Sequence, residues 1–147
     1  MVFKGTSEHT IDEKNRIAIP AKHRSRLQPD RDGNGFVIAM RQGEQCLSLY
    51  TERGFDKIAE RDEPTFQPAQ ERSDWELCFF STAEQVEPDS QGRIVIPPRM
   101  LARIGGGREV VICGVRDHLE IRGKQAYERR ISQYLAADPD RTDPTLQ

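Results

Sequence analysis

Two arginines, Arg16 and Arg93, hold the same place in two copies of the pattern Asp-x-x-x-Arg-Ile-x-Ile-Pro. A guanidinium group can grip a phosphate with two parallel hydrogen bonds, or read a guanine edge in the same way. Further basic residues accompany each copy. The pattern therefore predicts a phosphate-binding, nucleic-acid-binding surface. The candidate residues for this surface are Arg16, Arg93, Lys14, Lys22, Arg24 and Arg99.

The distribution of charge supports a locally basic surface. The formal net charge of the chain is −2, which excludes a globally basic nucleic-acid binder. Residues 12–26 nevertheless carry five basic and two acidic side chains, and residues 89–103 carry three and one. Residues 52–76 carry four basic and eight acidic side chains. If the two basic segments pack about a two-fold axis, they form one positive patch.

A simpler interpretation of the two arginines stays open beside this one. Arg16 and Arg93 can bridge Asp12 and Asp89 within their own turns, or lie on an ordinary solvated face. The occurrence of the same pattern twice, each time before a basic helix, favours the nucleic-acid interpretation.

The residues that usually carry catalysis or bind metal are few and badly spaced. The three histidines are His9, His23 and His118, and the three cysteines are Cys46, Cys78 and Cys113. No Cys-x-x-Cys pair, phosphate-binding Gly-Lys loop or nucleophile motif is present. We therefore predict no enzyme activity, no cofactor and no metal site. We expect reduced, structural cysteines in apolar surroundings, and His118 at a turn or strand edge.

The elements that must position the arginines recur in both halves of the chain. Each half is expected to run turn, strand, short helix, hairpin and closing helix, with the two copies of the motif 77 residues apart. Asn15 and Gly92 tolerate the positive φ that a tight turn requires. In the strands that follow, Ile17 and Ile19 share one face, as strand residues do, and Ile94 and Ile96 repeat this spacing. The expected short helices are 20–27 and 97–104, the hairpins 36–50 and 109–122, and the other helices 52–60, 69–80 and 124–135.

The chain length sets the organisation. The 147 residues suit one ordinary domain or two small halves that share a core. We expect a first repeat at 1–60, a connector with a helix at 61–82, a second repeat at 83–135 and a disordered tail at 136–147. The apolar runs are too short to cross a bilayer and the first residues have no apolar core typical of a secretory signal, so we expect no membrane association.

The doubled motif resembles the MraZ family of transcriptional regulators, and either copy alone resembles the wider class of AbrB-like DNA-binding modules. Phe3-Lys4-Gly5-Thr6, Pro20-Ala21-Lys22, Cys46-Leu47-Ser48-Leu49-Tyr50 and Phe79-Phe80-Ser81 also fit the family. The resemblance covers residues 1–135. Asn15 departs from the glycine that the family usually has there, and Gln91 lacks the charge of Lys14.

The resemblance implies a mainly β fold with short helices (α+β), built as a pseudo-two-fold double-split β-barrel from two AbrB-like repeats in one chain. It implies double-stranded DNA as partner, in the form of promoter direct repeats upstream of the chain's own division and cell-wall gene cluster. It also implies a homo-oligomeric ring and a cytoplasmic location on the nucleoid. The alternative is an oligomeric interaction module, antitoxin-like or scaffolding, that uses the same barrel without binding DNA.

Overall fold

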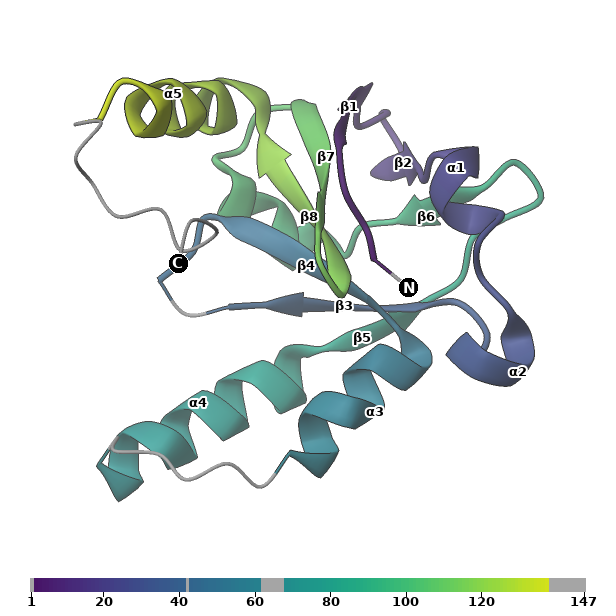
Figure 1. The fold of residues 1–147 in the computed structure, drawn as a ribbon, viewed down its shortest axis with the longest axis vertical. Helices are drawn as coiled ribbons and strands as arrows, with labels where there is room; N and C mark the ends of the chain where they lie inside the picture. Colours follow the sequence, from purple (N-terminus) through teal and green to yellow (C-terminus); the bar gives the residue numbers. More distant parts are fainter. Residues whose placement is uncertain (1, 42, 62–67, 138–147) are drawn as a thin grey trace.

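The computed structural model describes residues 2–41, 43–61 and 68–137, and it is mainly antiparallel β-sheet with short helices (Figure 1). The strands are β1 (Thr6–Thr10), β2 (Arg16–Ala18), β3 (Phe36–Met40), β4 (Cys46–Thr51), β5 (Glu84–Val86), β6 (Arg93–Val95), β7 (Glu109–Val115) and β8 (His118–Gly123). The helices are α1 (Ala21–Arg24), α2 (Pro29–Asp32), α3 (Glu52–Glu60), α4 (Ala69–Thr82), the 3₁₀ helix η1 (Pro98–Ile104) and α5 (Lys124–Leu135).

The six-stranded sheet has a strand order that is symmetric about its centre. Its order is β1-β7-β8-β4-β3-β5, and the repeat equates β1 with β5, β3 with β7 and β4 with β8. The edge strand of the first repeat therefore pairs with the second repeat, and the edge strand of the second pairs with the first. Neither repeat completes its own part of the sheet.

The strand registers locate the pseudo-two-fold axis. At the centre of the sheet, Ser48 faces Glu120, and these two residues hold equivalent places in the two repeats. In the separate two-stranded ribbon of β2 and β6, Ile17 faces its own equivalent, Ile94. The axis thus passes through both pairs, which relates the two motif arginines by the same symmetry.

The main core lies between the ribbon and one face of the sheet. Because neighbouring strand residues point to opposite faces, Leu47 and Leu49 point into this core while Ser48 and Tyr50 point away from it. Ile17 and Ile94 close the core from the ribbon side, and each is at most 1% exposed. Burial of an isoleucine side chain contributes about 1.5–3 kcal/mol, so this contact holds the ribbon against the sheet.

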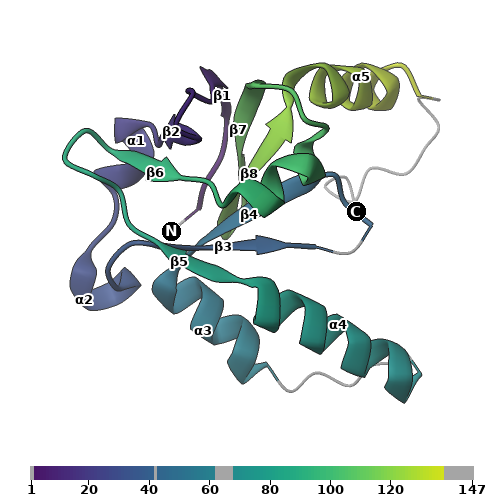
Figure 2. The same cartoon turned by 180° about the vertical axis from the view of Figure 1, so that it is seen from behind.

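The other face of the sheet is covered differently. Helices α3 and α4 lie beneath β3, β4 and β5, while α5 lies at the opposite end of the molecule (Figures 1 and 2). Tyr50, Ala39 and Phe79 form a second buried cluster between this face and the helices. In α3, the Thr51 hydroxyl caps the helix by accepting a hydrogen bond from the Gly54 amide at 2.9 Å.

Several expectations from the sequence are refined or corrected. The predicted helix at 20–27 is the single turn 21–24, and the predicted helix at 97–104 is a 3₁₀ helix at 98–104, because Pro20 and Pro97 leave only short segments before the next loop. Helices 52–60 and 124–135 agree with prediction, and the helix predicted at 69–80 extends two residues further, to Thr82. The mainly β class is confirmed, but the described strands form an open sheet plus a ribbon, and no hydrogen-bonded ladder closes them into a barrel.

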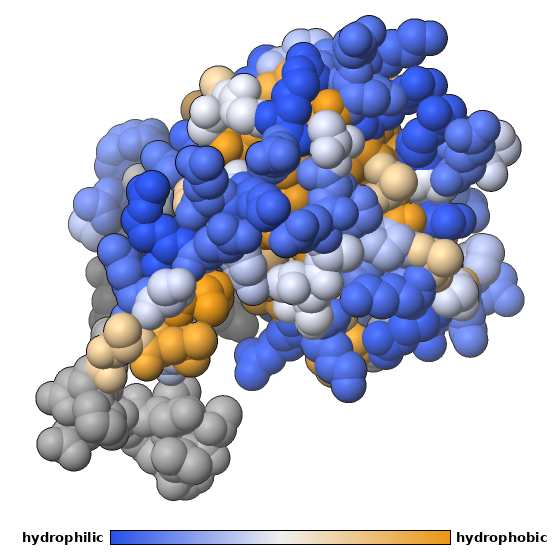
Figure 3. Space-filling model, turned by 90° about the horizontal axis from the view of Figure 1, so that it is seen from above, coloured by the Kyte–Doolittle hydropathy of each residue, from blue (hydrophilic) through white to orange (hydrophobic). Residues whose placement is uncertain are grey.

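The surface agrees with a polar protein. Seen from above, hydrophilic side chains cover most of the end that carries β1 and α5, and an exposed hydrophobic area lies toward the end of α5 (Figure 3). Within the described part of the chain, no helix is both long and apolar enough for a membrane span. Part of the 61–82 connector and the tail from Asp138 lie outside the described residues.

Candidate nucleic-acid interface

The first motif forms a turn around the carboxylate of Asp12. One oxygen, Oδ1, accepts hydrogen bonds from the amides of Lys14 at 2.9 Å and Arg16 at 2.8 Å. The other, Oδ2, accepts from the Arg16 guanidinium Nε at 2.7 Å. Asn15 completes the turn with a φ of 62°, and its amide donates to the Asp12 carbonyl. A single carboxylate therefore both shapes the turn and holds the arginine.

The second motif repeats this geometry atom for atom. Asp89 Oδ1 accepts from the amides of Gln91 and Arg93, each at 2.9 Å, and Oδ2 accepts from Arg93 Nε at 3.0 Å. Gly92 takes the positive φ, at 79°, where the first turn has Asn15. The departure at Asn15 therefore leaves the turn intact, since asparagine adopts this conformation more readily than most residues.

The two turns hold each other in place. The Ile19 amide donates to the Gly92 carbonyl at 2.9 Å, and the Ile96 amide donates to the Asn15 carbonyl at 2.8 Å. Each turn thus receives one backbone bond from the strand of the other repeat. The two arginines are fixed relative to each other by the backbone, as well as within their own turns.

The ribbon presents both arginines on its outer face. Arg16 lies opposite Val95 and Arg93 lies opposite Ala18, whereas the central isoleucine pair faces the core. Residues diagonal to one another on an antiparallel pair are roughly 7–8 Å apart. The arginine side chains are 27% and 29% exposed. Among the described residues, no hydrogen bond reaches the terminal nitrogens of either guanidinium, so these donors are not used within the described part of the chain.

The carboxylates that hold the arginines are kept ionised. The amide of Arg16, assisted by its guanidinium and the Lys14 amide, lowers the pKa of Asp12 below its ordinary value. The amides of Arg93 and Gln91 and the Arg93 guanidinium lower the pKa of Asp89 in the same way. Both turns therefore keep their charge through the neutral pH range.

The remaining predicted residues have distinct places. The Arg24 Nε donates to the Ile19 carbonyl at 2.8 Å, and its guanidinium lies so close to Gly92 that a β-carbon there would be 2.4 Å from Arg24 Cζ. Lys14 is exposed on the first turn. These two residues thus lie beside the motif arginines.

Two of the predicted residues are not brought to the turns. Arg99 pairs with Glu84 at 2.6 Å and donates to the Thr82 carbonyl at 3.0 Å, which places it at the start of β5. Lys22 holds the corresponding place near Gly5, at the start of β1. Both residues lie beside the strands that cross between repeats, and no described contact joins them to Arg16 or Arg93.

One basic residue at the first turn is not among the predicted ones. Arg108 donates to the Asp12 carbonyl at 2.7 Å, and its guanidinium lies 3.4 Å from Asn15 Oδ1. Its backbone carbonyl accepts from the Ile11 amide at 2.8 Å. Arg108 therefore supports the first turn as Arg24 supports the second, although the two residues are not equivalent in the repeat. The side-chain oxygen of Asn15 is the signal in the sequence, because glycine offers no such acceptor.

The histidines and cysteines differ in part from expectation. His118 directly follows the turn of the second hairpin, which agrees with the expected place at a turn or edge. It is nevertheless only 6% exposed, because its side chain lies on the sheet face that helices α3 and α4 cover. His23 is also buried, which lowers its pKa, and nearby Lys22 lowers it further. Cys46 and Cys113 are buried free thiols as predicted, whereas Cys78 is exposed rather than in apolar surroundings.

Comparison with known proteins agrees with this doubled architecture. A family model described as "MraZ protein, putative antitoxin-like" matches the chain twice, at residues 2–75 and 79–145. The chain belongs to the MraZ family. The two matches each contain one Asp-held arginine turn, so the family pattern and the symmetric geometry coincide.

Curated MraZ proteins match along nearly the whole chain. The transcriptional regulator MraZ of Arthrobacter sp. (strain FB24) is 36% identical over 92% of this chain and 88% of its own length. The transcriptional regulator MraZ of Paenarthrobacter aurescens (strain TC1) is 32% identical over 99% of this chain and 97% of its own length. The transcriptional regulator MraZ of Coxiella burnetii (strain Dugway 5J108-111) is 32% identical over 97% of this chain and 93% of its own length. These three relatives are all named as transcriptional regulators.

Proposed function

We propose that this MraZ-family chain is a transcriptional regulator that binds double-stranded DNA in a sequence-specific way through Arg16 and Arg93. The observation that carries the proposal is the pair of Asp-held arginines on the outer face of one ribbon. Their terminal nitrogens have no bond from the described residues. Two fixed guanidinium groups related by a two-fold axis suit phosphates or guanine edges on one stretch of DNA.

Lys14 and Arg24 extend this proposed surface. Lys14 is exposed beside Arg16, and Arg24 lies against the second turn. We assign these two residues to phosphate contacts, which position a protein on the duplex without reading its sequence. Lys22 and Arg99 lie at the starts of β1 and β5, and we assign them a supporting electrostatic role.

The proposed target follows from the family. The resemblance points to direct repeats in the promoter upstream of the chain's own division and cell-wall gene cluster. Such a target would bring the protein to the nucleoid. Several binding units on successive repeats would strengthen binding through effective concentration, provided that subunits are held together.

A gel-shift titration tests the proposal. The probes are the DNA directly upstream of the gene and a shuffled duplex of the same length and composition, each at several salt concentrations. We expect preference for the upstream DNA and a steep loss of affinity as salt rises. Arg16→Ala and Arg93→Ala should each weaken binding, while Arg129→Ala, an exposed site on α5, serves as a charge-matched control. Equal, wild-type affinity in both motif variants would remove the assigned site.

Assembly into a homo-oligomer is the second part of the proposal. The helices expose large apolar side chains: Leu77 is 69% exposed, Tyr134 57% and Leu135 75%. Contact between subunits, in a ring as the resemblance implies, is the usual way to cover such surface. Sedimentation of the native chain should give a species larger than the 16.8 kDa monomer at tens of micromolar, an order-of-magnitude working range. A monomer at that concentration would contradict this part.

A second candidate function has one specific observation behind it. The description of the matched family model includes the words antitoxin-like, and an antitoxin-like or scaffolding module would use the same fold to hold a protein partner. The two functions differ in salt response. A module without DNA binding would shift neither probe at any salt concentration, whereas a DNA-binding regulator gives the steep salt slope described above.

A further inference from the structure

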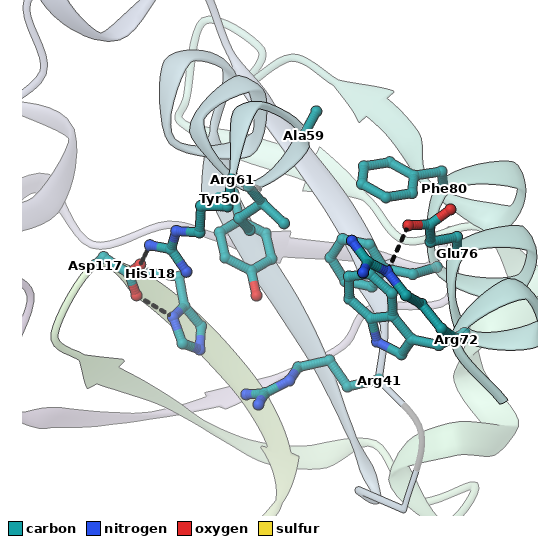
Figure 4. Close-up of a pocket in the computed structure, with 12 residues that line it drawn as sticks. Arg41, Tyr50, Ala59, Arg61, Arg72, Glu76, Phe80, Asp117 and His118 are labelled. Carbon is teal, nitrogen blue, oxygen red and sulfur yellow. Dashed lines mark hydrogen bonds and ion pairs between the residues drawn. The ribbon is translucent and has the colours of Figure 1, made fainter. Parts of the chain in front are cut away.

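The face of the sheet opposite the ribbon carries a cavity of about 450 Å³ between the sheet and helices α3 and α4 (Figure 4). This volume falls in the range of ordinary small-molecule sites, about 300–1,000 Å³. The cavity is remote from the arginine turns in the fold, because Ile17 and Ile94 face the other side of the sheet. The proposed DNA-binding function therefore makes no use of it.

Aromatic rings make up one part of the cavity wall. Trp75 and Phe79 stack nearly parallel, with ring centroids 5.3 Å apart and an interplanar angle of 10°. Tyr50 stacks on His118, with ring centroids 4.9 Å apart. Figure 4 shows the Tyr50 ring projecting into the cavity between His118 and Arg41. Tyr50 and Phe79 are only 5% and 3% exposed, so the half-buried Trp75 is the ring on which a planar ligand can stack.

Three arginines from three different parts of the chain surround the rings. Arg41 follows β3, Arg61 follows α3 and Arg72 lies on α4. Each has a carboxylate partner, but the closest distances are long: 3.4 Å from Arg41 to Glu120, 3.7 Å from Arg61 to Asp117 and 3.5 Å from Arg72 to Glu76. A strong charge-assisted bond is about 2.7–2.9 Å. These side chains are 43%, 54% and 40% exposed.

The loose pairing leaves donors for a ligand. A guanidinium has five N–H donors, so one long contact to a carboxylate uses only part of its capacity. The carboxylate of Asp117 is also engaged by the His118 ring at 2.7 Å, and that of Glu120 by the same ring at 2.8 Å. Asp117 and Glu120 are thus already bound by His118, whereas Glu76, which also lines the cavity, pairs with Arg72. Each arginine keeps guanidinium donors that its long carboxylate contact does not use.

We propose that this cavity binds a small aromatic anion, a flat ring that bears a carboxylate or a phosphate. The ring stacks against Trp75, and the anionic group is held by Arg41 and Arg72, with Arg61 completing the cationic rim. The aromatic side chains bind the ring of such a ligand, and the loosely paired guanidinium groups bind its anionic group. A neutral ring lacks partners for the arginines, and a bare anion leaves the aromatic wall unused.

Trp75 provides a direct readout, because it is the single tryptophan of the chain and lines the cavity. The native chain is titrated, without DNA, with phenyl phosphate or phenylacetate. The titration extends to about 1 mM, a concentration that matches the dissociation constant of a weakly bound small ligand. Phenol, which has the ring without the anionic group, and inorganic phosphate, which has the anionic group without the ring, serve as half-ligands. We expect saturable quenching or a shift of tryptophan emission with at least one of the two aromatic anions, and none with either half-ligand. The anion that binds tells whether the site takes a carboxylate or a phosphate.

Matched variants separate this site from the rest of the surface. Arg41→Gln and Arg72→Gln should each weaken binding about tenfold, since a hydrogen bond to a charged group contributes about that factor. Arg129→Gln, which removes the same charge from α5, should leave binding unchanged. Every one of these outcomes is read from tryptophan emission, so failure of DNA binding does not affect them.

Three results would overturn the proposal. The first is the absence of any saturable response to both aromatic anions. The second is an equal loss of binding in Arg129→Gln and Arg72→Gln, which would indicate general charge attraction. The third is a response to the aromatic anions that disappears as the protein concentration is raised, which would assign the cavity to contact with a second copy of the chain.

Discussion

The pseudo-two-fold axis crosses the molecule at two places, and the two differ in how well the repeat is preserved. At the β2–β6 ribbon, backbone and side chains are both symmetric: each turn has its Asp-held arginine and each strand its central isoleucine. At the β4–β8 pair, the register is symmetric but the side chains are not. Ser48 faces Glu120, and the place of Cys46 in one strand is held by His118 in the other.

The difference indicates what each region must do. A ribbon that presents the same group twice suits a partner that is itself repetitive, and this supports the proposed contact with duplex DNA. In the β4–β8 pair, one repeat has the small side chains of Cys46 and Ser48 where the other has His118 and Glu120, which belong to a hydrogen-bonded network. In that network, His118 and Arg122 both bond to the carboxylate of Glu120, which is 3% exposed.

The largest expected effect comes from breaking the ribbon at its centre. Ile94→Ala should lower the free energy of unfolding by about 2–5 kcal/mol, because it leaves a cavity where a fully buried side chain packs. Ile17→Ala should cost a similar amount, since the two residues face each other. Urea unfolding followed by circular dichroism measures both. Val95→Ala, on the exposed outer face, is the control, and a loss as large as that of Ile94→Ala would contradict the assigned direction of the core.

The second effect tests whether the symmetric side chains act alike. Arg16→Ala and Arg93→Ala should each cost about 1–3 kcal/mol in DNA binding, by similar amounts, at temperatures where the protein is folded. Affinity on upstream DNA and thermal midpoint are measured on the same samples. If the thermal midpoint falls while DNA affinity is retained, the arginines serve only to steady their turns.

A smaller effect comes from the asymmetric region. Burial opposes the charged form of His118, but its hydrogen bonds to Glu120 and Asp117 outweigh burial and raise its pKa. Burial likewise opposes ionisation of Glu120, but bonds from His118 and Arg122 outweigh it and lower the pKa of Glu120 to about 2. A raised histidine pKa stabilises the fold below the ordinary value near 6.5 and ceases to do so as pH rises through the folded-state value. His118→Gln should therefore cost about 1 kcal/mol at pH near 6 and less at pH near 9.

Urea unfolding of both proteins at the two pH values measures this difference directly. The other titrating groups are common to both proteins, so their contributions largely cancel in the comparison. A cost for His118→Gln that grows with pH would contradict the expected sign. The groups around this histidine are the carboxylates of Asp117 and Glu120, the Arg122 guanidinium that bonds to Glu120, and the stacked Tyr50 ring.

The smallest effect concerns the one place where the turns differ in charge. Lys14→Ala should reduce the salt slope of DNA binding by about one and weaken binding less than loss of a motif arginine. Gln91→Lys should give both turns a lysine at this place and increase the salt slope of DNA binding by about one. Gel-shift titrations over a series of salt concentrations measure both. Slopes that do not change in either variant would place these two positions away from the phosphate backbone.

The sequence predicts those parts of the fold that local rules determine. Asp12, Asn15 and Ile17 lie within six residues, so the turn, the positive φ and the strand can all be inferred from spacing. Because the motif occurs twice, its symmetry is also predictable. The open sheet and the exchange of β1 and β5 between repeats do not follow from such local rules, since pairing partners far apart leave little trace in one sequence.

The parts that sequence reasoning misses all depend on residues brought together from distant positions. His118 is expected at a turn or edge because it lies in a predicted hairpin, aligned with Cys46, whereas its burial is set by helices more than 30 residues away. Arg108 reaches the first turn across 96 residues. Two of the cavity arginines, Arg61 and Arg72, come from a segment whose net charge is negative, and only the fold separates them from the acidic residues around them.

The bonds that tie each turn to the other repeat also bear on how the protein is made. The amide of Ile96 completes the turn at Asn15, and β7 supplies the partner of β1. A chain growing from the ribosome therefore has no finished arginine pair until the second repeat has emerged and folded onto the first. A prematurely terminated product that ends before Ile96 would carry Arg16 without its framework. Such a fragment would lack β7 and the Ile96 amide, so the framework of Arg16 forms only in a chain that carries both repeats.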